Sequence, residues 1–348
     1  MKIVILSRYD FAGSGMRIRD AVRRYNPNHT INLVTYMPPR HSADYVLLEM
    51  IRTGIQDDRP MSVHDKIRNK ACRLNMQRKA CEPVQKLINE CDIVHFKGDY
   101  PPTRNWNDLI MIPEDKKIII SVGGSGFRRS SNNKKSSMAK WPMESYMLAD
   151  LRTALTPDLN YPEYKGIYTQ QAIDSESVEN SWQMPESNQQ LTIAHSPSCL
   201  IKKGTESIFL PAVVNIQKRY DLFNVDIITK MRYEKCLERK KKAQMFFDQA
   251  GVGFYGNAAL EAMQYGIPTI CHISQEAVEQ SDGKITKDHP VIAMRKATVK
   301  SCEYAIRKAL RSDLQKLSRE TKEFCDQFHS YSVVGKMWSD IYESLAKK

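Results

Sequence analysis

The strongest chemical signal lies in residues 246–273, which read FFDQAGVGFYGNAALEAMQYGIPTICHI. A short apolar run leads into a glycine-rich loop. Strong helix formers follow it, with Asn257 at the position of a helix cap. Such a strand, loop and helix start presents backbone N–H groups at the positive end of the helix dipole. The pattern predicts an anion site, and the anion that we expect is a phosphate.

Glu261 lies about one turn inside this predicted helix. From there its carboxylate could accept hydrogen bonds from a pair of ribose hydroxyls, or it could simply face water. A single glycine loop is weak evidence for a nucleotide site. The spacing alone therefore leaves both alternatives open.

A second glycine loop follows the first apolar run of the chain. Residues 2–6 form a short and mainly apolar run, Gly13 and Gly15 come next, and residues 16–25 have helical character with several arginines, among them Arg19. This loop could cradle a second phosphate. An ordinary tight turn between a strand and a helix would also require glycines, so that alternative stays open.

Polar groups also follow the predicted strands at residues 92–96 and 118–122. In open α/β sheets, ligands bind beyond the carboxyl ends of the strands. The pattern therefore favours a cleft at this edge of the first sheet. The polar candidates that follow or end these strands are His95, Lys97, Asp99, Arg128 and Arg129.

The elements that must position these groups alternate between strand and helix in both halves of the chain. This alternation predicts an α/β protein with two facing Rossmann-like domains. We expect the first domain over residues 1–180, the second over residues 190–328, and a C-terminal helix over residues 329–348. The polar stretch at 174–190 is the expected linker.

Composition sets further limits. The chain has 348 residues, enough for two domains, and its 41% hydrophobic and 26% charged residues are typical of a soluble globular protein. No apolar run approaches the roughly 20 residues of a membrane span. Its eight cysteines form no CxxC pair. They favour reduced thiols in a cytoplasmic protein and argue against a zinc site.

The net charge of +12 is unevenly distributed, because residues 116–140 hold seven bases and no acid. Such a bias suits an anionic partner: a nucleic acid, an acidic lipid surface or a phosphorylated glycan. A solvated basic face is the alternative, since no pattern of stacking aromatic residues accompanies the bases.

With these motifs in place, the chain resembles retaining glycosyltransferases of the two-domain GT-B architecture, family 4, the "glycosyl transferases group 1" type. The final segment, from residue 331, looks like the helix that crosses back onto the first domain in that family. The matching segments are the glycine loop at 13–15, DIVHF at 92–96, the strand with its Gly-Ser pair at 118–125, TPDL at 156–159, HSPSxxxKKGT at 195–205 and DQxxxGxYGxxALEAMxxGIPTIC at 248–271.

The resemblance implies a nucleotide-sugar donor, UDP-linked, held mainly by the second domain, with no metal and no other cofactor. Lys203 would contact the diphosphate, the backbone of residues 253–257 would cap it, and Glu261 would hold the ribose. The donor-binding residues expected in this way are Gly13, Gly15, Arg19, Ser198, Lys203, Gly204, Gly253, Tyr255, Gly256, Asn257 and Glu261.

The sequence departs from the family pattern at two site positions. Gly253 stands where the family has the first glutamate of its pair, and Ser198 stands where it has an arginine. Asp248 or Gln249 could take over from the missing glutamate, and Arg17, Arg19 or Lys202 could compensate for the missing arginine. The remaining catalytic candidates are His95 and Asp99, of which Asp99 would be the base if configuration were inverted. Lys97, Arg128 and Arg129 are expected on the acceptor side.

The resemblance therefore implies transfer of a sugar to a hydroxyl acceptor, and the acceptor stays open. It could be a membrane-associated glycan or lipid, or DNA carrying a 5-hydroxymethyl pyrimidine, as for virus-encoded DNA glycosyltransferases. A binding protein without catalysis is a further alternative. We expect a cytoplasmic location, at the membrane surface or in a host cell if the protein is viral. The oligomeric state cannot be predicted.

Overall fold

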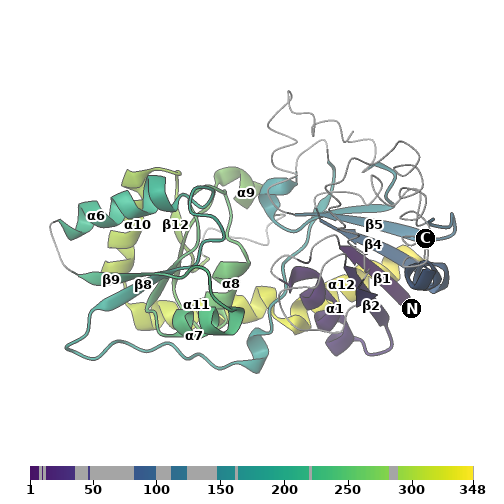
Figure 1. Cartoon of the computed structure of the whole chain (residues 1–348), viewed down its shortest axis with the longest axis horizontal. Helices are drawn as coiled ribbons and strands as arrows, with labels where there is room; N and C mark the ends of the chain where they lie inside the picture. Colours follow the sequence, from purple (N-terminus) through teal and green to yellow (C-terminus); the bar gives the residue numbers. More distant parts are fainter. Residues whose placement is uncertain are drawn as a thin grey trace, which may run out of the picture.

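The computed structural model describes residues 1–7, 10, 13–35, 46–47, 82–98, 111–123, 147–160, 164–218, 222–281 and 289–347. These residues form two parallel β-sheets, each with its own covering helices (Figure 1). The predicted α/β class with two Rossmann-like domains is confirmed.

The first sheet has seven strands in the order β3-β2-β1-β4-β5-β6-β7, and all neighbouring strands are parallel. Its central strands are nearly continuous apolar runs, as expected where helices cover both faces of a parallel sheet. The strands are β1 (Lys2–Ser7), β2 (Thr30–Thr35), β3 (Val46–Leu47), β4 (Ile93–Lys97), β5 (Lys117–Val122), β6 (Leu151–Ala154) and β7 (Ile167–Tyr168).

The second sheet has five parallel strands in the order β12-β11-β10-β8-β9. Its strands are β8 (Leu191–His195), β9 (Phe223–Ile227), β10 (Met245–Phe247), β11 (Thr269–His272) and β12 (Ile292–Met294). The helices of this domain are α6 (Leu210–Gln217), α7 (Tyr233–Lys241), α8 (Asn257–Met263), α9 (Gln275–Glu279), α10 (Val299–Arg311) and α11 (Leu314–His329).

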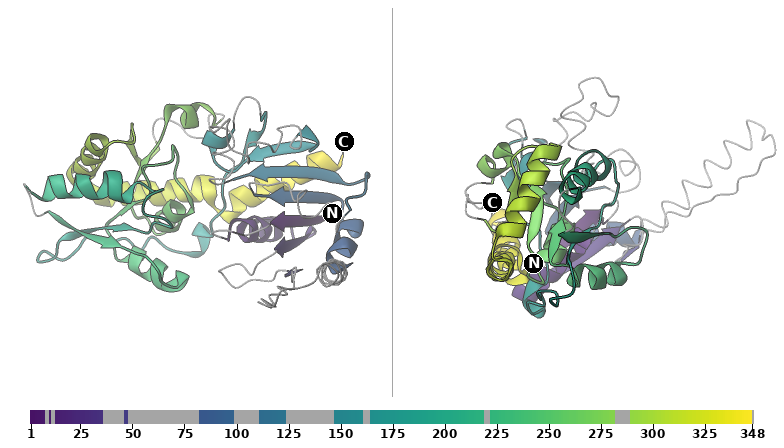
Figure 2. Two further views of the ribbon diagram at one scale, coloured as in Figure 1. Left: turned by 45° about the horizontal axis from the view of Figure 1, so that its top comes forward. Right: turned by 90° about the vertical axis from the view of Figure 1, so that its left-hand side faces the viewer.

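The chain crosses between the domains twice, and the two crossings are hydrogen-bonded to each other. The Ile173 N–H donates to the His329 carbonyl oxygen at 2.8 Å, and His329 Nδ1 lies 2.8 Å from the Gln171 carbonyl oxygen. After the second crossing, α12 (Tyr331–Ala346) runs onto the first domain, where it packs against α1 (Ser14–Tyr25) (Figure 2). The predicted return of the C-terminal helix is confirmed.

Gly335 allows α12 to approach α1 closely. A Cβ at this position would lie 2.3 Å from the Ala21 carbonyl oxygen and 2.9 Å from Tyr25 Cβ. The helices must therefore separate to admit even one methyl group. On the other side of the contact, Trp338 and Tyr342 are completely buried among the strands of the first sheet.

We expect Gly335→Ala to lower the free energy of unfolding by about 2 kcal/mol, because overpacking at this contact outweighs the better helix propensity of alanine. Urea unfolding followed by circular dichroism measures the change. The matched control on the same helix is Lys336→Ala, which removes only an exposed ion pair with Asp340 and should change stability by less than about 1 kcal/mol. Equal stability of the glycine variant and wild type would contradict the close packing.

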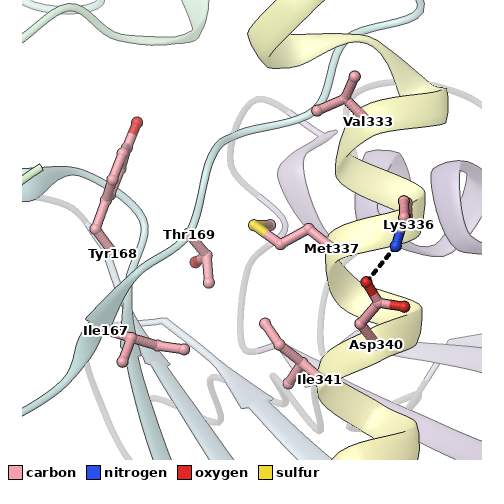
Figure 3. Close-up of a pocket in the computed structure, with 8 residues that line it drawn as sticks. All are labelled: Ile167, Tyr168, Thr169, Val333, Lys336, Met337, Asp340 and Ile341. Carbon is pink, nitrogen blue, oxygen red and sulfur yellow. Dashed lines mark hydrogen bonds and ion pairs between the residues drawn. The ribbon is translucent and has the colours of Figure 1, made fainter. Parts of the chain in front are cut away.

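A cavity of about 420 Å³ lies between β7 and α12. Figure 3 shows its lining, in which the Lys336–Asp340 ion pair stands beside mainly apolar side chains. None of its lining residues belongs to the candidate site described below. Within the ranges that the structure describes, no helix combines the length and the hydropathy needed to cross a bilayer.

Candidate functional site

The loops that follow β8 and β10 touch at the carboxyl edge of the second sheet. Two glycines permit this approach. A Cβ on Gly251 would lie 2.4 Å from the Lys202 carbonyl oxygen, and Gly204 has a φ of +72°. The Ala250 N–H also donates to the Lys203 carbonyl oxygen at 3.0 Å. Lys203 is thereby fixed beside the glycine-rich loop.

Lys203 carries a half-buried positive charge at this edge. Its ammonium donates a hydrogen bond to Gln249 Oε1, and the Gln249 amide donates to the Phe254 carbonyl oxygen. The neighbouring Lys202 is exposed to solvent. The lysine is therefore tied to the loop that follows β10. A charge held out of bulk water in this way interacts more strongly with an anion than a freely solvated one does.

The structure corrects the position of the helix cap. Gly256 is the N-cap of α8, with extended backbone, and Asn257 is the first residue of the helix. The Gly256 N–H donates to Asp248 Oδ2 at 2.7 Å, so one of the expected anion-binding amides already has a partner. Asp248 is 2% exposed, and its Oδ1 has no hydrogen-bond partner in the described part of the chain. Asp248 thus positions the loop.

Gly253 cannot be replaced by a larger residue without rearrangement, because a Cβ there would lie 2.7 Å from Ser274 Oγ. Ser274 is itself fixed, since its N–H donates to the Gly253 carbonyl oxygen and its hydroxyl accepts from the Ala277 N–H at the start of α9. The packing around Gly253 therefore leaves no room for the glutamate that the family has at this position. Tyr255 is buried, with its hydroxyl 2.9 Å from His329 Nε2, which leaves its backbone to line the loop.

Glu261 is buried between two cations. Its Oε1 accepts from Arg17 Nη2 at 3.0 Å, and its Oε2 accepts from Lys240 Nζ at 2.7 Å. Burial raises the pKa of the Glu261 carboxyl, but the charges of Lys240 and Arg17 outweigh burial and hold that pKa below its usual value. From the sequence, the Glu261 carboxylate was expected either to bind a pair of ribose hydroxyls or to face water. In the structure it contacts two basic side chains.

Arg17 reaches the second domain from the second turn of α1, which begins after Gly13. Besides its bond to Glu261, its guanidinium donates to Asn257 Oδ1 at 2.9 Å and to the Tyr233 hydroxyl at 3.0 Å. Arg17 is 5% exposed. It is therefore a buried contact between the domains, whereas the sequence offered it only as one of three possible replacements for the missing phosphate-binding arginine.

The glycine loop of the first domain is closed by Asp10. Its carboxylate accepts from the Gly15 N–H at 2.6 Å and from the Met16 N–H at 3.0 Å, and Lys97 Nζ lies 3.1 Å from Oδ1. A carboxylate of the chain itself thus occupies the amides that were expected to face a ligand phosphate. Lys97, expected on the acceptor side, is 7% exposed and held by the same acid.

Two other sequence candidates are packed inside the first domain. Arg19 is 3% exposed, and its Nε donates to the Asp20 carboxylate at 2.7 Å. His95 is fully buried, with Nε2 2.6 Å from Ser121 Oγ and Nδ1 2.9 Å from the Tyr342 hydroxyl. Burial lowers the pKa of His95 to about 3. In this structure His95 is a neutral residue that ties β4 to β5 and α12.

Three of the sequence candidates, Asp99, Arg128 and Arg129, lie outside the described residues. Ser198 is exposed in the loop after β8. Among the side chains that the structure describes, no three His, Cys, Asp or Glu residues converge as a metal site would require.

The sequence matches no family model and no curated protein. Solved structures do match over essentially their full length. The catalytic domain of starch synthase IV from Arabidopsis thaliana, bound to ADP and acarbose, has 10% identity, covers 100% of both chains and gives a TM-score of 0.64. Sucrose-phosphate synthase from Thermosynechococcus elongatus has 11% identity, covers 99% of both chains and gives 0.63.

A third similar structure is that of HepE from Anabaena in complex with UDP-glucose. It has 10% identity, covers 99% of this chain and 100% of the other, and gives a TM-score of 0.58. At such low identity the likeness establishes the fold and nothing finer. The fold is that of the GT-B glycosyltransferases, with two Rossmann-like domains facing each other.

Proposed function

We propose that this protein is a retaining glycosyltransferase that moves a sugar from a UDP-sugar to a hydroxyl acceptor. The observation that carries the proposal is the joint placement of Lys203 and the glycine-rich loop at the carboxyl edge of the second sheet, where open α/β sheets bind ligands. Among proteins of this fold, HepE was solved with UDP-glucose and starch synthase IV with ADP. We propose a uridine nucleotide as the donor by analogy with HepE.

In the proposed reaction the main barrier is the charge that develops on the departing diphosphate. The Lys203 ammonium, held by Gln249, is placed to stabilise that charge before the bond breaks. A phosphate oxygen of the donor takes the acceptor proton, and the acceptor attacks on the face that the diphosphate leaves. The reaction as proposed uses no protein base and no metal. Asp248 serves it by holding the loop through the Gly256 N–H.

The acceptor proposed first is a membrane-associated glycan or lipid, and the alternative is DNA with 5-hydroxymethyl pyrimidines. Both fit the net charge of +12. Gel retardation with increasing salt and sedimentation with anionic vesicles separate them, because phosphate contacts to DNA give a steep salt dependence. The proposal places the protein in the cytoplasm, in keeping with the six described cysteines, which are all free thiols.

A second candidate, a nucleotide-sugar-binding protein without catalysis, is favoured by the departures at Gly253 and Ser198. Both candidates predict that a UDP-sugar raises the melting temperature, since a ligand that binds only the folded state stabilises it. A panel of UDP-, ADP- and GDP-sugars tested by thermal shift identifies the donor. Slow hydrolysis of that donor without acceptor, unaffected by EDTA, supports the enzyme. Binding without hydrolysis supports the second candidate, and no binding by any donor contradicts both.

A further inference from the structure

Glu261, the carboxylate that the sequence resemblance assigns to the donor ribose, is bonded to a residue of the other domain. Both Glu261 oxygens are bonded, one to Arg17 of the first domain and one to Lys240 of the second. Arg17 also donates a hydrogen bond to the side-chain oxygen of Asn257 at the start of α8. Because Glu261 is also only 6% exposed, a ribose diol gains this carboxylate only by displacing one of the two cations.

We propose that Arg17 is an interdomain latch that competes with the nucleotide. In the nucleotide-free protein it holds the two domains together by occupying Glu261, and nucleotide binding must displace it. This inference rests on the proposed function, because it concerns the same donor site. It assigns to the first domain a residue that lowers the apparent affinity for the nucleotide.

The contacts decide which of the two cations leaves. Lys240 belongs to the same domain as Glu261, is 1% exposed, and lies over the Phe246 ring, with its ammonium also 3.3 Å from the Ala258 carbonyl oxygen. It stays with Glu261 when the domains separate. The hydrogen bonds that the Arg17 guanidinium donates to Asn257, Tyr233 and Glu261 each cross the domain boundary. Domain opening therefore breaks the arginine contacts and spares the lysine contact.

The charges of Arg17, Lys240 and Glu261 also indicate that Arg17 is the cation that leaves. Arg17 and Lys240 together place two positive charges on the single negative charge of Glu261. When Arg17 withdraws, Glu261 and Lys240 remain as a neutral pair, so no uncompensated charge is left buried. The freed Oε1 and the Asn257 amide then become acceptors for ligand hydroxyls. Removal of Arg17 should accordingly leave a protein that folds.

The size of the effect follows from the closed fraction of the free protein. If the latch is closed in about nine molecules of ten, the apparent dissociation constant is about ten times the intrinsic one. Arg17→Ala is therefore expected to bind UDP and UDP-glucose about tenfold more tightly than wild type. Isothermal titration calorimetry measures both constants.

The matched control is Arg24→Ala on the same helix. Arg24 forms an exposed ion pair with Asp174, and its further contacts in the described part of the chain, to Ser177 and the Tyr331 ring, lie outside the donor site. Its loss should leave the affinity for UDP unchanged. Small-angle X-ray scattering without nucleotide provides a readout independent of binding: Arg17→Ala should have a larger radius of gyration than wild type and Arg24→Ala.

The outcomes separate the latch from the proposed function. UDP binding that is equal or weaker in Arg17→Ala overturns the latch while leaving the transferase proposal intact. An unchanged radius of gyration also overturns it. If wild type and both variants bind none of the nucleotides or nucleotide sugars, the proposed function fails, and the competition proposed here fails with it.

Discussion

The free energy of unfolding is expected to fall by about 5 kcal/mol between pH 7 and pH 5. Three buried histidines cause this loss. Burial lowers the pKa of His95 to about 3, and burial also lowers the pKa values of His195 and His329 to about 4. Each ring is held by hydrogen bonds inside the fold. For His195 the partners are the Phe247 carbonyl oxygen and the Thr205 hydroxyl.

The sign of the effect follows from where the protons bind. An unfolded histidine has a pKa near 6.5, so at pH 5 the unfolded chain carries about one more proton per ring than the folded protein does. Protonation therefore stabilises the unfolded state as the pH falls below about 6.5, and the free energy of unfolding decreases. Most carboxylates are ionised in both states above pH 5, which leaves the histidines as the main contributors in this interval.

Urea unfolding at a series of pH values between 7 and 5 measures the effect. The His95→Gln variant is the internal control, because it removes one of the three titrating rings and should reduce the slope by about one third. A free energy of unfolding that stays constant across this interval in wild type would show that the three rings are protonated in the folded state as well.

Substitution of Lys203 by methionine is expected to reduce kcat/KM for the donor by about 100-fold, the usual effect of losing one preorganised donor at developing charge. Methionine keeps the length of the apolar stem and removes the ammonium that Gln249 holds in the structure. Steady-state transfer or donor hydrolysis measures the loss. The melting temperature, determined in parallel, shows whether the fold is retained.

Lys202→Met is the matched control, since the neighbouring lysine is exposed and should change kcat/KM by less than about twofold. Full activity of Lys203→Met would contradict the assigned role of the ammonium. Equal losses in the two variants would indicate that the overall charge of the loop matters and that the position of Lys203 does not.

The fold could be predicted from the sequence because its signals are local. The apolar runs of β1, β4 and β5 end in glycine or polar residues, and the 246–273 stretch contains its strand, loop and helix in one continuous segment. The pairing of Lys203 with the glycine-rich loop, in contrast, came only from the family resemblance, because the two lie about 50 positions apart in the sequence. The direct contact between Gly251 and Lys202 explains why both loops carry glycines.

The electrostatics of the site could not be predicted, because the partners are distant in sequence. Arg17 and Glu261 are separated by 244 positions, and nothing in the local pattern distinguishes Arg17 from the other arginines of α1. The role of Asp10 could not be predicted either. A carboxylate that fills its own glycine loop leaves the same sequence pattern as a loop that waits for a phosphate.

The position of α12 has a consequence for synthesis on the ribosome. Trp338 and Tyr342 complete the core around β1 and α1, yet they are translated after the whole second domain. The amino-terminal half must therefore wait, with apolar surface uncovered, until its last helix emerges from the exit tunnel. Nascent chains that lack residues 331–347 should thus be the species that chaperones retain, whereas the central domain can acquire its structure while still tethered.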